Sequence, residues 1–167
     1  MSEVISKHTI DVAIIMGSKS DWETMKNCAG LLREFGIRID SRVLSAHRTP
    51  NELAEYLNDL NKRQVRVIIA AAGLAAHLGG VIASHSLTPV IGVPMNAGSL
   101  NGMDALLSMV QMPPGIPVAV MGIGKPGAIN AALFAVQMLS LKDPSLVEKM
   151  AAYRKTQSDK VLNETLD

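Results

Sequence analysis

The chain has 167 residues, a formal net charge of +1 and one cysteine. A chain of this length has room for one domain with a buried core, and its near-neutral charge gives no electrostatic reason to bind nucleic acid or an anionic membrane. A lone cysteine excludes an intrachain disulfide. The polar stretch 1–8 also lacks the apolar core of a signal peptide, so we expect a cytoplasmic protein.

Short apolar runs alternate with amphipathic runs along the chain. Ser20 with Glu23 predicts a capping box at the start of the first helix, which ends at Gly36. Thr49 with Glu52 predicts a second box, and Pro50 suits the first helical position. The predicted strands are 10–16, 37–44, 65–70, 90–93 and 116–120, and the predicted later helices are 75–84, 103–112, 128–141 and 145–166.

The alternation predicts an α/β fold. Uniformly apolar strands are typical of a parallel sheet that is covered on both faces. Five such strands suit a single-domain, doubly wound, flavodoxin-like three-layer α/β/α architecture, here followed by a C-terminal helix. We expect one domain over 1–167, with a mobile tail at 1–9. Cys28 falls on the apolar stripe of the first helix and is expected in the core.

Charge is distributed unevenly. Histidines aside, residues 67–141 contain only two charged side chains, Asp104 and Lys125. Prolines and glycines interrupt this stretch, and its longest apolar helix, 128–141, is shorter than the ~20 residues that cross a bilayer. An uncharged surface of this extent is typical of subunit contacts, so we expect a homo-oligomer of more than two chains.

Ligands of doubly wound folds bind beyond the carboxyl ends of the strands. After the first strand, Gly17 permits a sharp turn, and Ser18 and Ser20 offer hydroxyl groups to an anion at a helix start. Asp21 would repel a phosphate but could accept hydrogen bonds from a ribose. A plain helix cap explains this loop equally well.

The second loop, 45–50, also precedes a helix. Arg48 could grip a phosphate with two hydrogen bonds, and His47 could exchange a proton near neutral pH. A solvated surface loop is the alternative. The third loop, 71–80, is made of small residues around His77, and a lone histidine in such a setting is more often a core residue than a catalytic one. His85 is expected to be structural.

Other sites find less support. Residues 122–127 match the Gly-x-Gly-x-x-Gly dinucleotide fingerprint, but they follow the last strand rather than the first. Asp143, at about the right separation for the acidic partner, comes after a helix. The histidines have no metal-ligand spacing, and there is no Gly-x-Ser-x-Gly elbow.

Taken together, several motifs resemble the N5-carboxyaminoimidazole ribonucleotide mutase family of purine biosynthesis. The resemblance extends from about Val12 to Leu162. The motifs are Gly-Ser-Lys-Ser-Asp at 17–21, Ser-Ala-His-Arg-Thr-Pro at 45–50, Ala-Ala-His-Leu at 75–78, Pro-Val-Ile-Gly-Val-Pro at 89–94 and Leu-Leu-Ser-Met-Val-Gln-Met-Pro at 106–113.

The resemblance implies an isomerase that moves CO2 from the exocyclic N5 of an aminoimidazole ribonucleotide to ring carbon C4. It implies no metal, no ATP and no organic cofactor, and an octamer with sites near subunit boundaries. His47 matches the catalytic histidine and His77 a pocket histidine, and these two are the candidate catalytic residues, with His77 as the competing candidate for the proton shuttle. The residues that match nucleotide-binding or pocket positions are Ser18, Asp21, Arg48, Ser45, Ala46, Gly73 and Leu78.

Two departures and two alternatives accompany this hypothesis. Gly79 stands where the family usually has proline, and Ala97-Gly98 where a Ser-Lys pair is common. A related branch carboxylates aminoimidazole ribonucleotide directly with free CO2. A non-catalytic nucleotide-binding module would need the phosphate site but not His47. In the mutase hypothesis, His47 serves as a single proton shuttle, first as acid and then as base.

Overall fold

The computed structural model describes residues 10–166; the predicted mobile tail, with His8, lies outside the described residues. Five strands form one parallel sheet in the order β2-β1-β3-β4-β5. This is the flavodoxin-like strand order, so the predicted fold class is confirmed. The strands are β1 Val12–Met16, β2 Ile39–Val43, β3 Val67–Ala72, β4 Val90–Pro94 and β5 Ala119–Val120. The helices are α1 Trp22–Glu34, α2 Pro50–Lys62, α3 Leu78–His85, α4 Met103–Val110, α5 Lys125–Ser140 and α6 Ser145–Leu162, with a 3-10 turn, η1, at Lys19–Asp21.

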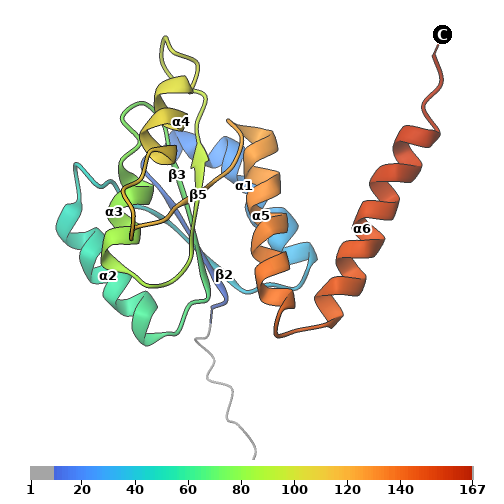
Figure 1. The fold of residues 1–167 in the computed structure, drawn as a ribbon, viewed down its shortest axis with the longest axis horizontal. Coiled ribbons are helices and arrows are strands. Elements are labelled where there is room, and N and C mark those ends of the chain that lie inside the picture. Colours follow the sequence, from blue (N-terminus) through green and yellow to red (C-terminus); the bar gives the residue numbers. More distant parts are fainter. Residues whose placement is uncertain (1–9, 167) are drawn as a thin grey trace, which may run out of the picture.

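Helices cover the sheet on both faces (Figure 1). The period of two along a strand sends alternate side chains to opposite layers. In β1, Val12 and Ile14 join the core beneath α1 and α5, whereas Ala13 and Ile15 join the core beneath α2, α3 and α4. All residues of β1, β3 and β4 are buried, while edge strand β2 is partly exposed. Cys28 is fully buried in the first core, as expected.

The strands and helices lie close to their predicted places, although several of their ends differ. Strand β3 begins two residues late because Val65 closes the end of α2, its N–H donating to the carbonyl of Leu60. Helix α3 begins at Leu78 rather than near Ala75, because the N–H of His77 bonds to the carbonyl of Ala75 in a tight turn. Strand β5 has only two residues.

Both predicted capping boxes are wrong. The box that forms lies two residues earlier: Ser18 accepts from the N–H of Ser20, and Asp21 accepts from the N–H of Ser18, at 3.1 Å. Thr49 is the N-cap of α2, with Pro50 at the first position as predicted, but it makes no side-chain cap bond. Its hydroxyl instead binds the backbone of Ser45.

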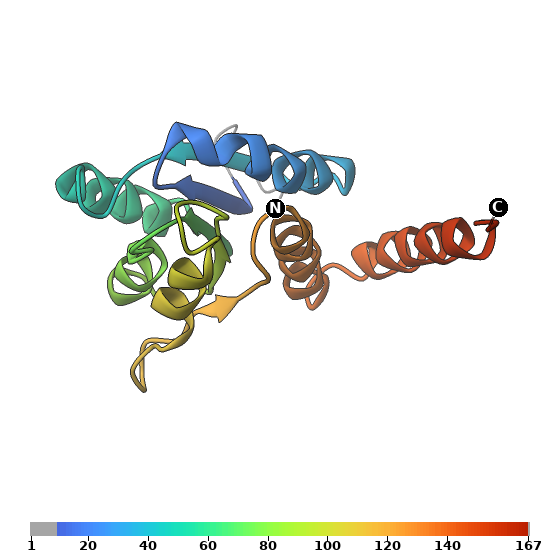
Figure 2. The same cartoon turned by 90° about the horizontal axis from the view of Figure 1, so that it is seen from above.

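The later part of the chain packs less completely. Helix α5 buries one face, formed mainly by alanines, and leaves Phe134 37% exposed. Helix α6 buries only Leu146 and Met150 and extends away from the sheet (Figure 2). It ends at Leu162, four residues before the predicted end. Within residues 10–166, none of the helices has the length and apolarity to cross a membrane.

Candidate functional site

A cavity of about 490 Å3 opens at the carboxyl ends of β1, β2 and β3. The loops that follow these strands form its walls, and Ala97 from the loop after β4 completes it. This is the edge at which doubly wound folds place their ligands. The cavity is lined by Gly17, Ser18, Ser20, Asp21, Ser45, Ala46, His47, Arg48, Ala72, Gly73, Leu74, Ala75, His77, Leu78 and Ala97.

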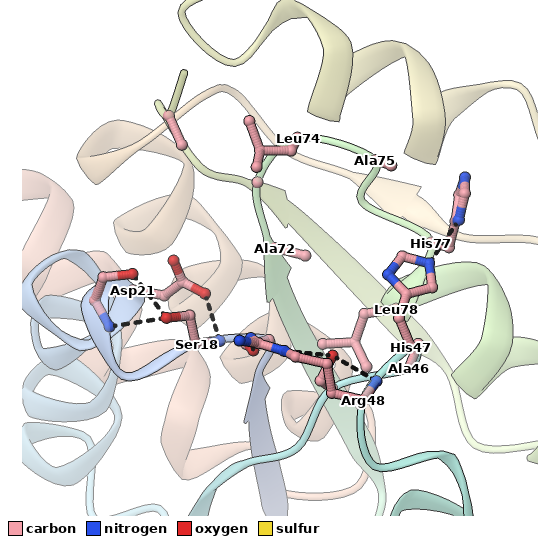
Figure 3. Close-up of a pocket in the computed structure, with 15 residues that line it drawn as sticks. Ser18, Asp21, Ala46, His47, Arg48, Ala72, Leu74, Ala75, His77 and Leu78 are labelled. Carbon is pink, nitrogen blue, oxygen red and sulfur yellow. Dashed lines mark hydrogen bonds between the residues drawn. The ribbon is translucent and has the colours of Figure 1, made fainter.

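One wall carries hydroxyl groups and a carboxylate. The Ser20 hydroxyl donates to the Ser18 hydroxyl at 2.9 Å, and the capping box holds Asp21 beside them (Figure 3). Burial raises the pKa of Asp21, and this effect outweighs the backbone hydrogen bond from Ser18 and the charge of Arg48. The fold therefore keeps a partly desolvated carboxylate here whose remaining acceptor capacity is open to a ligand.

The second wall is fixed by its own backbone network. The N–H of Ser45 donates to the Thr49 hydroxyl at 2.8 Å, and the N–H of Thr49 donates to the Ser45 carbonyl at 3.0 Å. The N–H of Arg48 donates to the Ser45 hydroxyl at 3.2 Å. These bonds define the turn that carries His47, which gives the imidazole a set position although it is exposed.

Arg48 joins the first two walls. Its Nη2 donates to the carbonyl of Gly17 at 2.8 Å, and its Nε lies 3.5 Å from the Ser45 hydroxyl. The guanidinium thus lies across the carboxyl end of β1, near Ser18 (Figure 3). An exposed guanidinium beside two serine hydroxyls can bind a phosphate, since its remaining N–H donors match phosphate oxygens.

Two histidines meet at the other end of the cavity. Nε2 of His47 lies 2.9 Å from Nδ1 of His77, and the rings are nearly perpendicular, at 88°. The residues are 30 positions apart in sequence and come from the loops after β2 and β3. A hydrogen bond between two imidazoles needs a proton on one nitrogen and a lone pair on the other. The contact therefore couples the tautomers of the two rings.

The third wall is apolar and tightly folded. Leu74 has a left-handed backbone with φ of 56°, which costs a bulky residue about 1–2 kcal/mol. Gly73 lies against the loop after β4, where a Cβ would come within 3.0 Å of the Cβ of Ala97. Leu78 is buried beneath the cavity, whereas Leu74 is 54% exposed.

All ten predicted site residues line this one cavity. The residues are Ser18, Ser20, Asp21, Ser45, Ala46, His47, Arg48, Gly73, His77 and Leu78. The interpretation of His77 as a core residue is wrong, because the side chain is exposed and contacts His47. Its neighbours Ala76 and Leu78 are buried, whereas the imidazole stays outside the core.

Sequence reasoning missed part of the lining. Leu74, Ala75 and Ala97 carry no polar group, so no motif chemistry singled them out as site residues. His85 is outside the cavity, and its Nδ1 lies 2.9 Å from the carbonyl of Val81, on its own helix. The glycine-rich run 122–127 is also outside. There Gly127 has a packing role, since a Cβ would collide with the carbonyl of Gly122.

No cluster for a metal ion is found in the part of the chain that the structure describes. Within residues 10–166, no group of three His, Cys, Asp or Glu side chains is placed to share one ion. The donors of the cavity are hydroxyls, a guanidinium and imidazoles, which suit an anionic organic ligand.

Comparisons with known proteins agree with this chemistry. A sequence model described as AIR carboxylase matches residues 11–160. A protein from Pyrococcus abyssi named N5-carboxyaminoimidazole ribonucleotide mutase is 54% identical over 143 residues, covering 86% of this chain and 81% of its own length. A protein of the same name from Bacillus subtilis is 50% identical over 154 residues, covering 92% of this chain and 95% of its own length.

A solved structure shows the same architecture. The PurE protein of Treponema denticola superimposes with a TM-score of 0.82 at 29% sequence identity. The match covers 90% of this chain and 93% of that one. The likeness therefore extends over most of the fold.

Proposed function

The chain belongs to the AIR carboxylase family, and from this premise we propose that it is an N5-carboxyaminoimidazole ribonucleotide mutase of purine biosynthesis. The enzyme moves a carboxyl group from the exocyclic N5 of its substrate to ring carbon C4. The observation that carries the proposal is the contact between His47 and His77 at one end of a cavity whose other end holds Arg48 and Ser18. Candidate proton-transfer groups and a candidate phosphate site thereby face the same cavity.

The substrate is proposed to bind along the cavity. Its 5′-phosphate binds Arg48, Ser18 and Ser20, its ribose hydroxyls donate to Asp21, and the aminoimidazole ring lies toward the histidines. The small residues of the third wall allow a flat ring to approach the backbone. Arg48 supports this orientation because its Nη2 is already held over the end of β1, 2.8 Å from the carbonyl of Gly17.

In the proposed mechanism, His47 first acts as the acid. The N5–carbon bond of the carbamate breaks, CO2 forms, and N5 takes a proton from His47. The electron-rich ring then attacks CO2 through C4, which becomes tetrahedral. The neutral His47 removes the proton from C4 and restores the aromatic ring. The proton balance is closed because the residue that gave a proton recovers one.

His77 is proposed to support this cycle by fixing the His47 tautomer. When Nε2–H of His47 donates to Nδ1 of His77, a neutral His47 keeps its free lone pair on Nδ1, the nitrogen that gives and recovers the proton. The hydrogen bond also holds the imidazole of His47 in place, so the ring does not have to rotate before each proton transfer. His77 thus positions the shuttle rather than replacing it.

Direct carboxylation of aminoimidazole ribonucleotide with free CO2 is the alternative within the same family. The two activities are separated by supplying the N5-carboxylated substrate in one reaction, and the uncarboxylated ribonucleotide with bicarbonate in another. A mutase forms the C4-carboxylated product faster in the first reaction. Faster product formation from bicarbonate at modest concentration would establish the carboxylase. If neither reaction formed product, the non-catalytic nucleotide-binding module would be the remaining alternative.

We also propose that the protein works in the cytoplasm as a homo-oligomer, with eight chains as the expected number. Helix α4 presents Met103, Leu107 and Val110, each more than half exposed, and Leu87 is fully exposed on the loop before β4. Burying this apolar surface between copies would stabilise an assembly. Light scattering at micromolar concentration should return about eight times the mass of one chain; the mass of a monomer would refute it.

A further inference from the structure

Leu74 has a backbone conformation that a glycine at the same position would adopt at lower cost. Its φ of 56° lies in the left-handed region, which glycine adopts freely and bulky residues rarely do. The residue is also 54% exposed, so much of its apolar surface meets water. Glycine at position 74 would remove both penalties. A leucine here is therefore best explained by something that covers it.

Neighbouring loops hold the Leu74 side chain in place. Gly98, with φ of 67°, lies directly against it, and a Cβ on Gly98 would come within 2.6 Å of Cδ2 of Leu74. Gly73 makes similar room for Ala97, as a Cβ there would lie 3.0 Å from the Cβ of Ala97. The glycines let two loops pack closely, and Leu74 is fixed between them at the rim of the cavity.

Leu74 is the large apolar side chain with free surface in the cavity. The other leucine of the lining, Leu78, is 2% exposed and already packed in the core. The remaining apolar lining residues are alanines and glycines. Figure 3 shows Leu74 on the upper wall, above Ala72 and across from Arg48. A planar heterocycle bound between these walls would cover it.

We propose that Leu74 determines how tightly the aminoimidazole ring is held and how well CO2 is retained during transfer. This inference rests on the mutase function proposed above. CO2 is small and uncharged, so the cavity can hold it only with close walls. The competing outcome is leakage, in which the N5–carbon bond breaks, N5 takes a proton, and CO2 escapes before C4 attacks. The products are then aminoimidazole ribonucleotide and free CO2.

Leu74→Gly in the full chain tests the inference. The variant removes the leucine side chain that is proposed to contact the ring, and it also relieves the backbone strain at position 74. The melting temperature should therefore stay the same or rise. We expect KM for the N5-carboxylated substrate to rise about fivefold to tenfold, the scale of losing half of a leucine contact. The fraction of substrate released as aminoimidazole ribonucleotide should rise at least severalfold, as should incorporation of labelled bicarbonate into product.

Two further variants complete the design. Leu74→Asn keeps a similar size and tolerates left-handed backbone, but presents a polar side chain, so its leakage should also exceed that of the parent. Gln64→Gly is the matched control. Gln64 has a φ of 54° in the turn between α2 and β3, outside the cavity. It should gain stability as Leu74→Gly does, with KM and leakage unchanged.

The inference is wrong if both Leu74 variants fold and keep the KM and leakage of the parent. It is equally wrong if they lose oligomeric mass while leakage stays unchanged, because Leu74 would then cover a neighbouring copy. Failure of the proposed function is a separate result: the parent itself would not isomerise the substrate. Calorimetric titration with the C4-carboxylated ribonucleotide would still test whether Leu74→Gly weakens ligand contact.

Discussion

The two ends of the parallel sheet use the same residue types in opposite ways. At the amino end of β1, Asp11 accepts from Nε of Arg38 at 2.8 Å and from Nη2 at 3.0 Å. At the carboxyl end, Asp21 accepts from the N–H of Ser18 and faces an open cavity. The first carboxylate has its charge paired within the chain, whereas the second keeps acceptor capacity for a ligand.

The pKa shifts of the two carboxyls express the same difference. Burial alone would raise the pKa of Asp11, but hydrogen bonds and the charge of Arg38 outweigh it and lower the pKa. Burial also raises the pKa of Asp21, and there the hydrogen bonds and the more distant Arg48 do not overcome it. Pairing at one end stabilises the fold, and incomplete pairing at the other gives up stability for binding.

The largest effect is expected from His47→Asn at the functional end. Loss of the proton shuttle should reduce kcat by about 10²–10⁴, the usual contribution of a general acid–base group. Nucleotide should still bind, because Arg48 and Ser18 remain. His77→Asn should lose less, since it removes only the partner at 2.9 Å. Steady-state kinetics with the N5-carboxylated substrate give both values, and a kcat within tenfold of the parent for His47→Asn would contradict the assignment.

Arg48→Ala should act on binding rather than on chemistry. A hydrogen bond to a charged group contributes about 1.5–3 kcal/mol, so KM should rise roughly ten- to a hundredfold. Arg38→Ala is the control at the structural end, where an arginine also forms short hydrogen bonds. It should leave KM unchanged. An unchanged KM in Arg48→Ala would show that the phosphate binds elsewhere.

Asp11→Asn should lower stability without altering activity. The folded-state pKa is lowered, so the stabilisation is present above the unfolded value of 3.8 and is lost as the pH falls through the folded pKa. We expect a loss of about 0.2–1 kcal/mol at pH 7, the range for a partly exposed ion pair. The gap between variant and parent in denaturant unfolding should begin to close near pH 3.8 and vanish once the pH is below the lowered folded-state pKa; a gap that persisted there would rule out the charge as its source.

Asp21→Asn should have the smallest effect on stability and the opposite sign. The folded-state pKa is raised, so stability from this group is present at low pH and is lost as the pH rises through the folded pKa. Removing the charge should therefore stabilise the fold at pH 7, by no more than about 0.5 kcal/mol. Substrate affinity should fall, because an amide NH2 donor replaces one of the two acceptor oxygens, and the N–H of Ser18 already occupies the other. A less stable variant at pH 7 would contradict this account.

The sequence alone determined the fold class and the strand order that goes with it. Apolar runs such as 12–16 and 67–72, separated by amphipathic helices, can be buried only in a parallel sheet covered on both faces. The position of the site followed, because loops after such strands gather at one edge. Arg48 and His47 were identified for the same reason, since their chemistry stands out within a loop.

The tertiary structure alone decided the contacts between loops that are distant in sequence. His77 looks like a core residue in a run of small apolar residues, and only the pairing of β3 beside β1 brings it within 2.9 Å of His47. The capping boxes also depended on context: Ser18 and Ser20 offer the same chemistry two positions apart, and the tight turn after β1 selects Ser18. Likewise, Leu74 lines the cavity because Gly98, from the next loop, leaves room for it. Such choices depend on distances across the sheet, which a local pattern does not contain.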